Sequence, residues 1–123
     1  TPAASTSKFL VMGNVKLGHN AYYGYFRIER DGSPVAQADA AGSRPLVHGL
    51  GTYGNNGEDY ELASASVQFL ETAGSTSSTT FNVAVMTYNS SYTTYVNRSS
   101  IDRDTSTYEP RSISTITVME ISA

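Results

Sequence analysis

The sequence predicts an all-β protein, and three observations support that class. The 123 residues include 17 Ser and 14 Thr, and only 15% are charged, whereas long surface helices favour Glu, Lys, Ala and Leu. Nine Tyr and four Phe suit pleated strands that are buried on one face. Apolar residues recur in short runs between clusters of turn residues, and none of these runs keeps a helical period. A chain of this length is expected to form one domain around one core.

The first strands follow an N-terminal arm of residues 1–8, and residues 9–123 are expected to form the single domain. Phe9–Leu17 is an apolar run whose Gly-Asn centre indicates a kink. Tyr22–Arg30 alternates, with Phe and Ile on one face and Tyr, Arg and Glu on the other. Asp31-Gly32 then predicts a hairpin, because such a turn needs positive φ at its central residues. The second strand should therefore pair with Pro34–Asp39.

Ala40–Asp59 is so rich in glycine that it predicts a long loop, which is expected to be functional or part of an assembly surface. Asn89-Ser90-Ser91 predicts a second hairpin between the strands on either side of it. The remaining predicted strands are Glu61–Glu71, Phe81–Asn89, Tyr92–Asn97 and Ser112–Ile121. About eight short antiparallel strands are typical of a β-sandwich or jelly roll.

The closing strand, Ser112–Ile121, is apolar on both faces. Ile116 and Val118 are expected on one face, and Ile113, Met119 and Ile121 on the other. In a free-standing sandwich one face of each strand meets water, so a second apolar face indicates a partner, and another copy of the chain is the simplest one. We therefore predict Ile113, Met119 and Ile121 as a homo-oligomer interface. The alternative is a central strand with exposed apolar groups, which ordinary protein surfaces tolerate.

Composition excludes several classes of function. The net charge of -3 provides no basic field for nucleic acid. The absence of Cys removes disulfides, thiolate nucleophiles and cysteine-based metal sites. No run approaches the roughly 18 apolar residues of a membrane span, and Thr1–Lys8 lacks the apolar middle of a secretory signal. We expect no nucleic-acid partner and no membrane insertion.

No motif predicts an enzyme, a cofactor or a metal site. Gly49–Gly54 fits GxGxxG, but polar residues follow it in place of a helix. His19 and His48 have no nearby ligand partner and are expected at surface or loop positions. Asp59 or Asp102 could serve a glycan-cleaving domain, but the sequence indicates no apolar pocket that would raise the pKa of one acid of a pair. A non-enzymatic role is therefore expected.

Binding is the better-supported chemistry. Several tyrosines lie in or beside predicted loops with Asn, Asp and Arg neighbours, a mixture that stacks on sugar rings and hydrogen-bonds their hydroxyls. The predicted ligand-binding residues are Tyr53, Tyr92, Arg103 and Tyr108. The alternative is that these tyrosines pack inside the sandwich or between subunits.

The C-terminal half carries a more specific pattern. Tyr95–Ser99 is followed by Asp102, Tyr108 and Arg111, and then by Ser114–Ile121. Together with Ser7–Asn14, Phe26–Gly32 and Thr76–Phe81, this pattern resembles the small trimeric jelly-roll domains of bacteriophage tail fibres and other virion surface proteins. Those domains are similar in architecture to the complement globular head and tumour necrosis factor. The resemblance covers nearly the whole chain except Ala40–Asp59.

The resemblance implies a homotrimer of jelly rolls packed about a threefold axis. It also implies that Asn97, Arg98, Asp102 and Arg111 order the loop before the last strand. Fibre tips usually follow a long stem, and only eight residues precede the first predicted strand here, which counts against the tail-fibre version. Either the stem has been cut away, or the chain is expected to be a small protein that decorates a capsid or sits on a fibre made by another chain. The expected function is a non-enzymatic trimeric knob on the surface of a phage virion that attaches to a host-surface glycan. The alternative is a capsid decoration or cement protein without a ligand, whose partners are other virion proteins.

Overall fold

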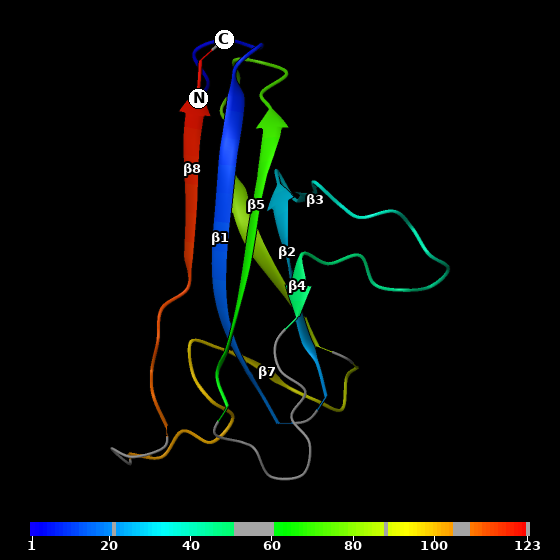
Figure 1. Cartoon of the computed structure of the whole chain (residues 1–123), viewed down its shortest axis with the longest axis vertical. Coiled ribbons are helices and arrows are strands. Elements are labelled where there is room, and N and C mark those ends of the chain that lie inside the picture. Colours follow the sequence, from blue (N-terminus) through cyan, green and yellow to red (C-terminus); the bar gives the residue numbers. More distant parts are fainter. Residues whose placement is uncertain (21, 51–60, 88, 105–108, 123) are drawn as a thin grey trace.

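The described part of the chain forms eight β-strands in two antiparallel four-stranded sheets (Figure 1). The computed structural model describes residues 1–20, 22–50, 61–87, 89–104 and 109–122. None of these residues is helical, so the predicted all-β class is confirmed. Within the same ranges no helix is long and apolar enough to cross a membrane.

The first sheet is organised around β1 (Lys8–His19). Strand β5 (Ala63–Thr72) pairs with β1 from Lys8 to Leu17 along one edge. On the other edge, β8 (Thr115–Ile121) pairs with Lys8–Asn14, and β7 (Thr94–Val96) pairs with the last three residues of β1. The pairing runs unbroken through Gly13 and Asn14, so β1 is one continuous strand.

The second sheet is organised around β2 (Gly24–Arg30). Strand β6 (Phe81–Thr87) pairs with its full length, so the two short strands β3 (Ser33–Pro34) and β4 (Gly49–Leu50) share its other edge. The predicted turn at Asp31-Gly32 is confirmed, with φ of 50° and 80°. The predicted partner Pro34–Asp39 is too long, because pairing with β2 ends at Pro34.

The core lies between the sheets and follows the alternation of the two central strands. Its fully buried apolar residues come chiefly from the odd positions of β1 and the even positions of β2, and they are Phe9, Val11, Val15, Leu17, Phe26, Ile28 and Ala73. The apolar residues that β5 and β6 direct inward are only partly buried. Two strands therefore hold most of the dry core, which is small for a chain of this length.

Arg30, at the end of β2, ties the two sheets together. Its Nη1 donates to the carbonyl oxygen of Thr72 at 2.7 Å, and its Nε donates to the hydroxyl of Thr79 at 3.1 Å. The guanidinium also lies 5.8 Å from the centre of the Phe9 ring. Charge-assisted bonds of this kind are stronger than neutral ones, so Arg30 closes this end of the sandwich.

The predicted loop Ala40–Asp59 contains a strand. Phe26 pairs with Gly49 of β4, and the His48 amide donates to the Phe26 carbonyl at 2.9 Å. The Ile28 amide falls in the gap between β3 and β4, and it donates to Nδ1 of His48 at 2.8 Å. The imidazole therefore replaces a backbone acceptor in the sheet, which a search for turn residues does not anticipate.

The predicted hairpin between Phe81–Asn89 and Tyr92–Asn97 is wrong. Strand β6 pairs with β2, whereas β7 pairs with β1, so the chain crosses from one sheet to the other between them. The amide of Thr93 donates to Oδ1 of Asn20 at 3.0 Å, and the amide of Asn97 donates to the Lys16 carbonyl at 3.0 Å. These bonds to residues 16 and 20 hold β7 against the end of β1.

The expectation of a surface or loop position is wrong for His19, which ends β1 and is only 4% exposed. Among the described residues, neither ring nitrogen has a hydrogen-bond partner. Burial lowers the pKa of His19 below its ordinary value of 6.5, and the nearby Glu61 carboxylate opposes part of that shift. Because the unfolded chain takes up this proton at a higher pH than the folded chain, the free energy of unfolding must fall as pH drops below about 6.5, until His19 also titrates in the fold.

Replacing His19 with Leu should remove this acid sensitivity. The His19→Leu variant is expected to gain on the order of 1 kcal/mol at pH 8, because burying an unpaired polar group costs about 1–3 kcal/mol. Urea unfolding at pH 8, 6 and 5 measures both effects. Parallel pH dependences in the two proteins would show that the His19 ring does not carry the linkage.

Candidate functional site

Part of the outer surface of the first sheet is aliphatic. The register of β5, β1 and β8 brings Leu70, Leu10 and Met119 into one row across the sheet. Leu70 is 56% exposed, Met119 is 52% exposed and Ile121 is 47% exposed. We call this surface the aliphatic face and define it as Leu10, Met12, Leu70, Met119 and Ile121. Met119 and Ile121 belong to the predicted interface. Leu10, Met12 and Leu70 come from β1 and β5, so the sequence of the closing strand could not indicate them.

The third residue of the predicted interface, Ile113, lies outside the strand. Strand β8 begins at Thr115 rather than at the predicted Ser112, so Ile113 belongs to the preceding loop, where it is 73% exposed. The alternation that placed it beside Met119 therefore does not extend to this position.

The inner side of β8 is also incompletely covered. Ile116 and Val118 remain 36% and 41% exposed, because β8 lies at an edge of its sheet. A groove lies beside Val118, between β8 and the start of β6, and Phe9 and Phe81 contribute to its lining. Both faces of the closing strand therefore present apolar side chains to solvent in a single chain.

The four residues predicted to order the loop before the last strand lie close together. The side chain of Arg111 donates to Asp102 at 2.6 Å, and Arg98 lies 3.6 Å from the same carboxylate. Arg98 and Arg111 also form an isolated antiparallel bridge. Asn97 accepts a hydrogen bond from the Ser112 amide at 2.9 Å. These contacts join the two ends of the segment between residues 97 and 112.

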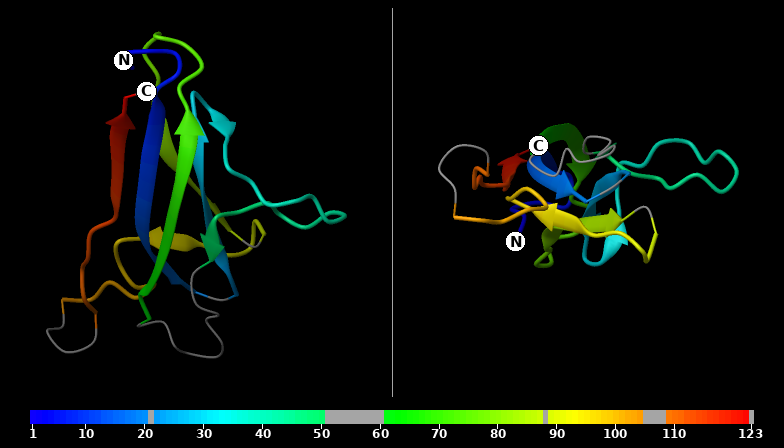
Figure 2. Two further views of the ribbon diagram at one scale, coloured as in Figure 1. Left: turned by 45° about the horizontal axis from the view of Figure 1, so that its top comes forward. Right: turned by 90° about the horizontal axis from the view of Figure 1, so that it is seen from below.

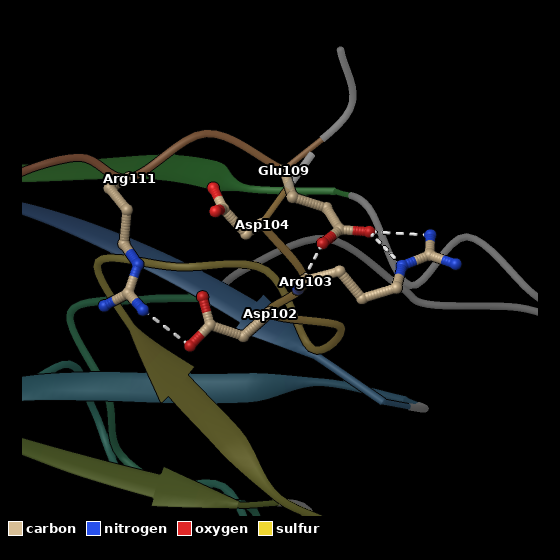
Figure 3. A pocket seen from close by; sticks show the side chains of 5 residues that line it. All are labelled: Asp102, Arg103, Asp104, Glu109 and Arg111. Carbon is tan, nitrogen blue, oxygen red and sulfur yellow. Dashed lines mark hydrogen bonds and ion pairs between the residues drawn. The ribbon is translucent and has the colours of Figure 1, made fainter. Parts of the chain in front are cut away.

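A shallow pocket opens on this loop (Figure 3), and it is lined by Asp102, Arg103, Asp104, Glu109 and Arg111. Arg103 is one of the predicted ligand contacts. Its Nη2 lies 2.7 Å from the carboxylate of Glu109, whose side chain is almost completely buried. The guanidinium of Arg103 is thus already engaged in neutralising a buried acid.

The predicted ligand tyrosines are only partly described. Tyr53 and Tyr108 lie outside the described residues. Tyr92 is half-buried, and its ring centre lies 4.8 Å from that of Tyr22, with the ring planes tilted. Tyr22 has a positive φ of 57° and is 38% exposed. It was not among the predicted ligand residues, although it is one of a run of tyrosines at the start of β2.

The described ligand candidates, Tyr92 and Arg103, and the chain termini lie at opposite ends of the sandwich. Figures 1 and 2 show both termini beside the end of β8, whereas β7 and the loop that follows it lie at the other end. Tyr92 belongs to this second end, because Thr94, two residues further along, pairs with His19 at the end of β1. The described ligand candidates therefore gather where β1 finishes.

The described residues offer no site for metal chemistry, since no group of three His, Asp or Glu side chains among them is placed to hold a metal ion. Asp59, considered for a glycan-cleaving acid pair, lies outside the described residues. Asp102, the other acid considered, is paired with Arg111 and Arg98.

A second surface was missed as a site, although the alternation of β2 placed its residues on one face. Tyr23, Tyr25, Arg27 and Glu29 point away from the core, because the residues between them are buried. Asn82 lies opposite Glu29 on β6. We call these five residues the tyrosine–arginine face. The signal in the sequence was the mixture of aromatic and charged residues on the polar side of an amphipathic strand.

No family model matches the chain, and no curated protein or solved structure does so either.

Asn97 is expected to control the docking of β8, because it has a positive φ of 66° and its Oδ1 accepts the Ser114 hydroxyl at 2.6 Å. The same hydroxyl accepts the Lys16 amide at 3.0 Å. Asn97→Ala should lose about 2–3 kcal/mol of stability, from one lost hydrogen bond and one strained backbone position.

Asn97→Gly is the matched control, since glycine removes the side chain and keeps the backbone conformation. It should lose about half as much, measured by urea unfolding, with hydrogen exchange in β8 faster in both variants. Equal losses of stability in the two variants would show that the backbone conformation at residue 97 does not contribute. No loss in either variant would contradict the role of Asn97 in docking β8.

Proposed function

We propose that this chain is a non-enzymatic trimeric module of a virion surface, with a jelly-roll fold, that attaches the particle to a glycan on its host. The observation that carries the proposal is the aliphatic face, which a single chain leaves open to water. Contiguous apolar patches on soluble proteins commonly mark interaction sites. The resemblance in the C-terminal half supplies the virion setting and the threefold arrangement.

The total exposed area is consistent with a subunit of an assembly. A compact monomer of this mass exposes about 6,400 Å², whereas this chain exposes 7232 Å². The segment of residues 36–47 projects from the sandwich (Figure 2), and both faces of β8 carry exposed apolar side chains. Sister copies that cover the aliphatic face would also shield the sheet edge at β8, whose exposed backbone is otherwise open to aggregation.

The arrangement of the two ends fits attachment. Sister copies that pack through the side of the sandwich leave the end with Tyr22 and Tyr92 free. Loops carried at one end of a rigid β-scaffold are common binding sites. The termini lie at the opposite end (Figure 1), where a connection to the particle would not obstruct that end.

A capsid decoration role is the second candidate, and one observation favours it. Residues 36–45 are all exposed and project from the sandwich (Figures 1 and 2). The base of this segment is fixed, because Nε2 of His48 lies 3.0 Å from the Ala36 carbonyl oxygen. A projecting segment on a fixed base can grip a neighbouring protein. The N-terminal residues are poorer candidates for this role, since Ala3, Ser5 and Ser7 hydrogen-bond within the same chain.

Attachment predicts that the labelled protein binds cells or an array of surface glycans. Binding should fall at least about tenfold in Tyr92→Ala and Tyr108→Ala, because an aromatic contact with a ligand contributes energy of that order. Ser78→Ala, in an exposed turn at the terminal end, is the matched control and should bind as the wild type does.

Absence of binding to both cells and glycans would contradict the attachment function. Binding to capsids that survives Tyr92→Ala, but is lost when residues 38–43 are replaced by a short glycine linker, would establish the decoration role instead.

A further inference from the structure

The tyrosine–arginine face combines an aromatic shelf with an ordered polar row. The rings of Tyr23 and Tyr25 have centres 6.3 Å apart and planes inclined by 33°, so together they form a shallow shelf on the outer side of β2. Arg27 and Glu29 continue the same row along the strand. On β6, Ala84 stands opposite Arg27 and contributes only a methyl group.

The polar row is fixed by its own hydrogen bonds. Nε and Nη2 of Arg27 lie 2.9 Å and 2.7 Å from the same oxygen of Glu29. The other oxygen of Glu29 accepts Nδ2 of Asn82 at 3.2 Å. The hydrogen bond from Arg27 is the main cause of the lowered pKa of Glu29, and the bond from Asn82 adds to it. The carboxylate is therefore charged at neutral pH, and its charge is balanced by Arg27.

This arrangement leaves both donors and acceptors unused. Arg27 carries five N–H groups, and its only described partner is Glu29. Within the described part of the chain, no group donates to Oδ1 of Asn82. The face thus presents guanidinium N–H donors and an amide acceptor beside an aromatic shelf, and their positions are set before any ligand arrives.

We propose that the tyrosine–arginine face binds a neutral saccharide ring. The C–H face of a pyranose packs on Tyr25, while its hydroxyl groups accept from Arg27 and donate to Asn82. An ordered set of a few polar groups beside an apolar surface is the usual composition of a small-ligand site. A neutral sugar fits because Arg27 is already compensated, whereas an acidic sugar would meet the carboxylate of Glu29.

The location supports a ligand rather than a sister copy as the occupant. The aliphatic face lies on the outer side of the first sheet, and the tyrosine–arginine face lies on the outer side of the second. Copies that cover the first leave the second facing outward. The inference rests on the proposed attachment function and names the ligand class and a further binding surface on the outer side of β2.

The test is a titration of the wild-type assembly with methyl glycosides of glucose, galactose and mannose and with N-acetylglucosamine, followed by saturation-transfer NMR. The acidic trisaccharide 3′-sialyllactose is the charged counterpart. At least one neutral sugar should bind, and its affinity should fall at least about tenfold in Tyr25→Ala and in Asn82→Ala. Tyr25→Phe keeps the ring and should bind as the wild type does. Ser78→Ala, in an exposed turn at the terminal end, is the control and should also bind as the wild type does.

Each result decides the inference. Neutral-sugar binding that is lost in Tyr25→Ala and kept in Tyr25→Phe and Ser78→Ala supports it. Absence of neutral-sugar binding, exclusive binding of 3′-sialyllactose, or binding that survives both Tyr25→Ala and Asn82→Ala overturns it. Binding that is lost only in Tyr92→Ala also overturns it, but leaves the attachment function standing. That function fails separately, if cells and glycan arrays give no signal.

Discussion

Strand β1 is paired along both edges and carries apolar side chains on both faces, and the other features of the fold depend on this constraint. Its odd positions supply much of the buried core, and three strands of the first sheet hydrogen-bond to it. Its even positions face the other way, and they include the apolar Leu10 and Met12 between the polar Lys8, Asn14 and Lys16. A strand with side chains of this kind on both faces is usual in the middle of a three-layer structure, yet one chain supplies only two layers.

The outer faces of the two sheets carry different side chains. The second sheet covers its outer face with tyrosines and with the hydrogen-bonded row of Arg27, Glu29 and Asn82, which tolerates water. The first sheet has hydrogen-bonded polar side chains only farther along β1, where Asn14 and Lys16 donate to Ser66 and Ser64. The row of Leu70, Leu10 and Met119 is aliphatic. The missing layer is therefore expected over the first sheet. Because the outer faces differ in this way, we assign the assembly surface to the first sheet and the ligand surface to the second.

Local sequence patterns predicted the all-β class, the central strands and the Asp31-Gly32 turn, because alternation and turn chemistry act over a few residues. They failed for β4 and for the partner of β7, which depend on long-range pairing. His48 fills a gap in the second sheet, and Asn97 binds Lys16 and Ser112, through contacts between residues distant in the chain. Of the candidate sites, the closing strand revealed Met119 and Ile121. Leu10 and Leu70 joined them only through register, which one strand cannot reveal.

The most direct test of the account is the mass of the wild-type protein in solution at micromolar concentration, measured by light scattering together with that of Met119→Glu. The account predicts an assembly of three copies of the 13.2 kDa chain for the wild type, and dissociation to folded single chains for the variant, because a carboxylate buried against a sister copy is costly. A stable single chain for the wild type, with Met119 and Ile121 in water, would contradict it.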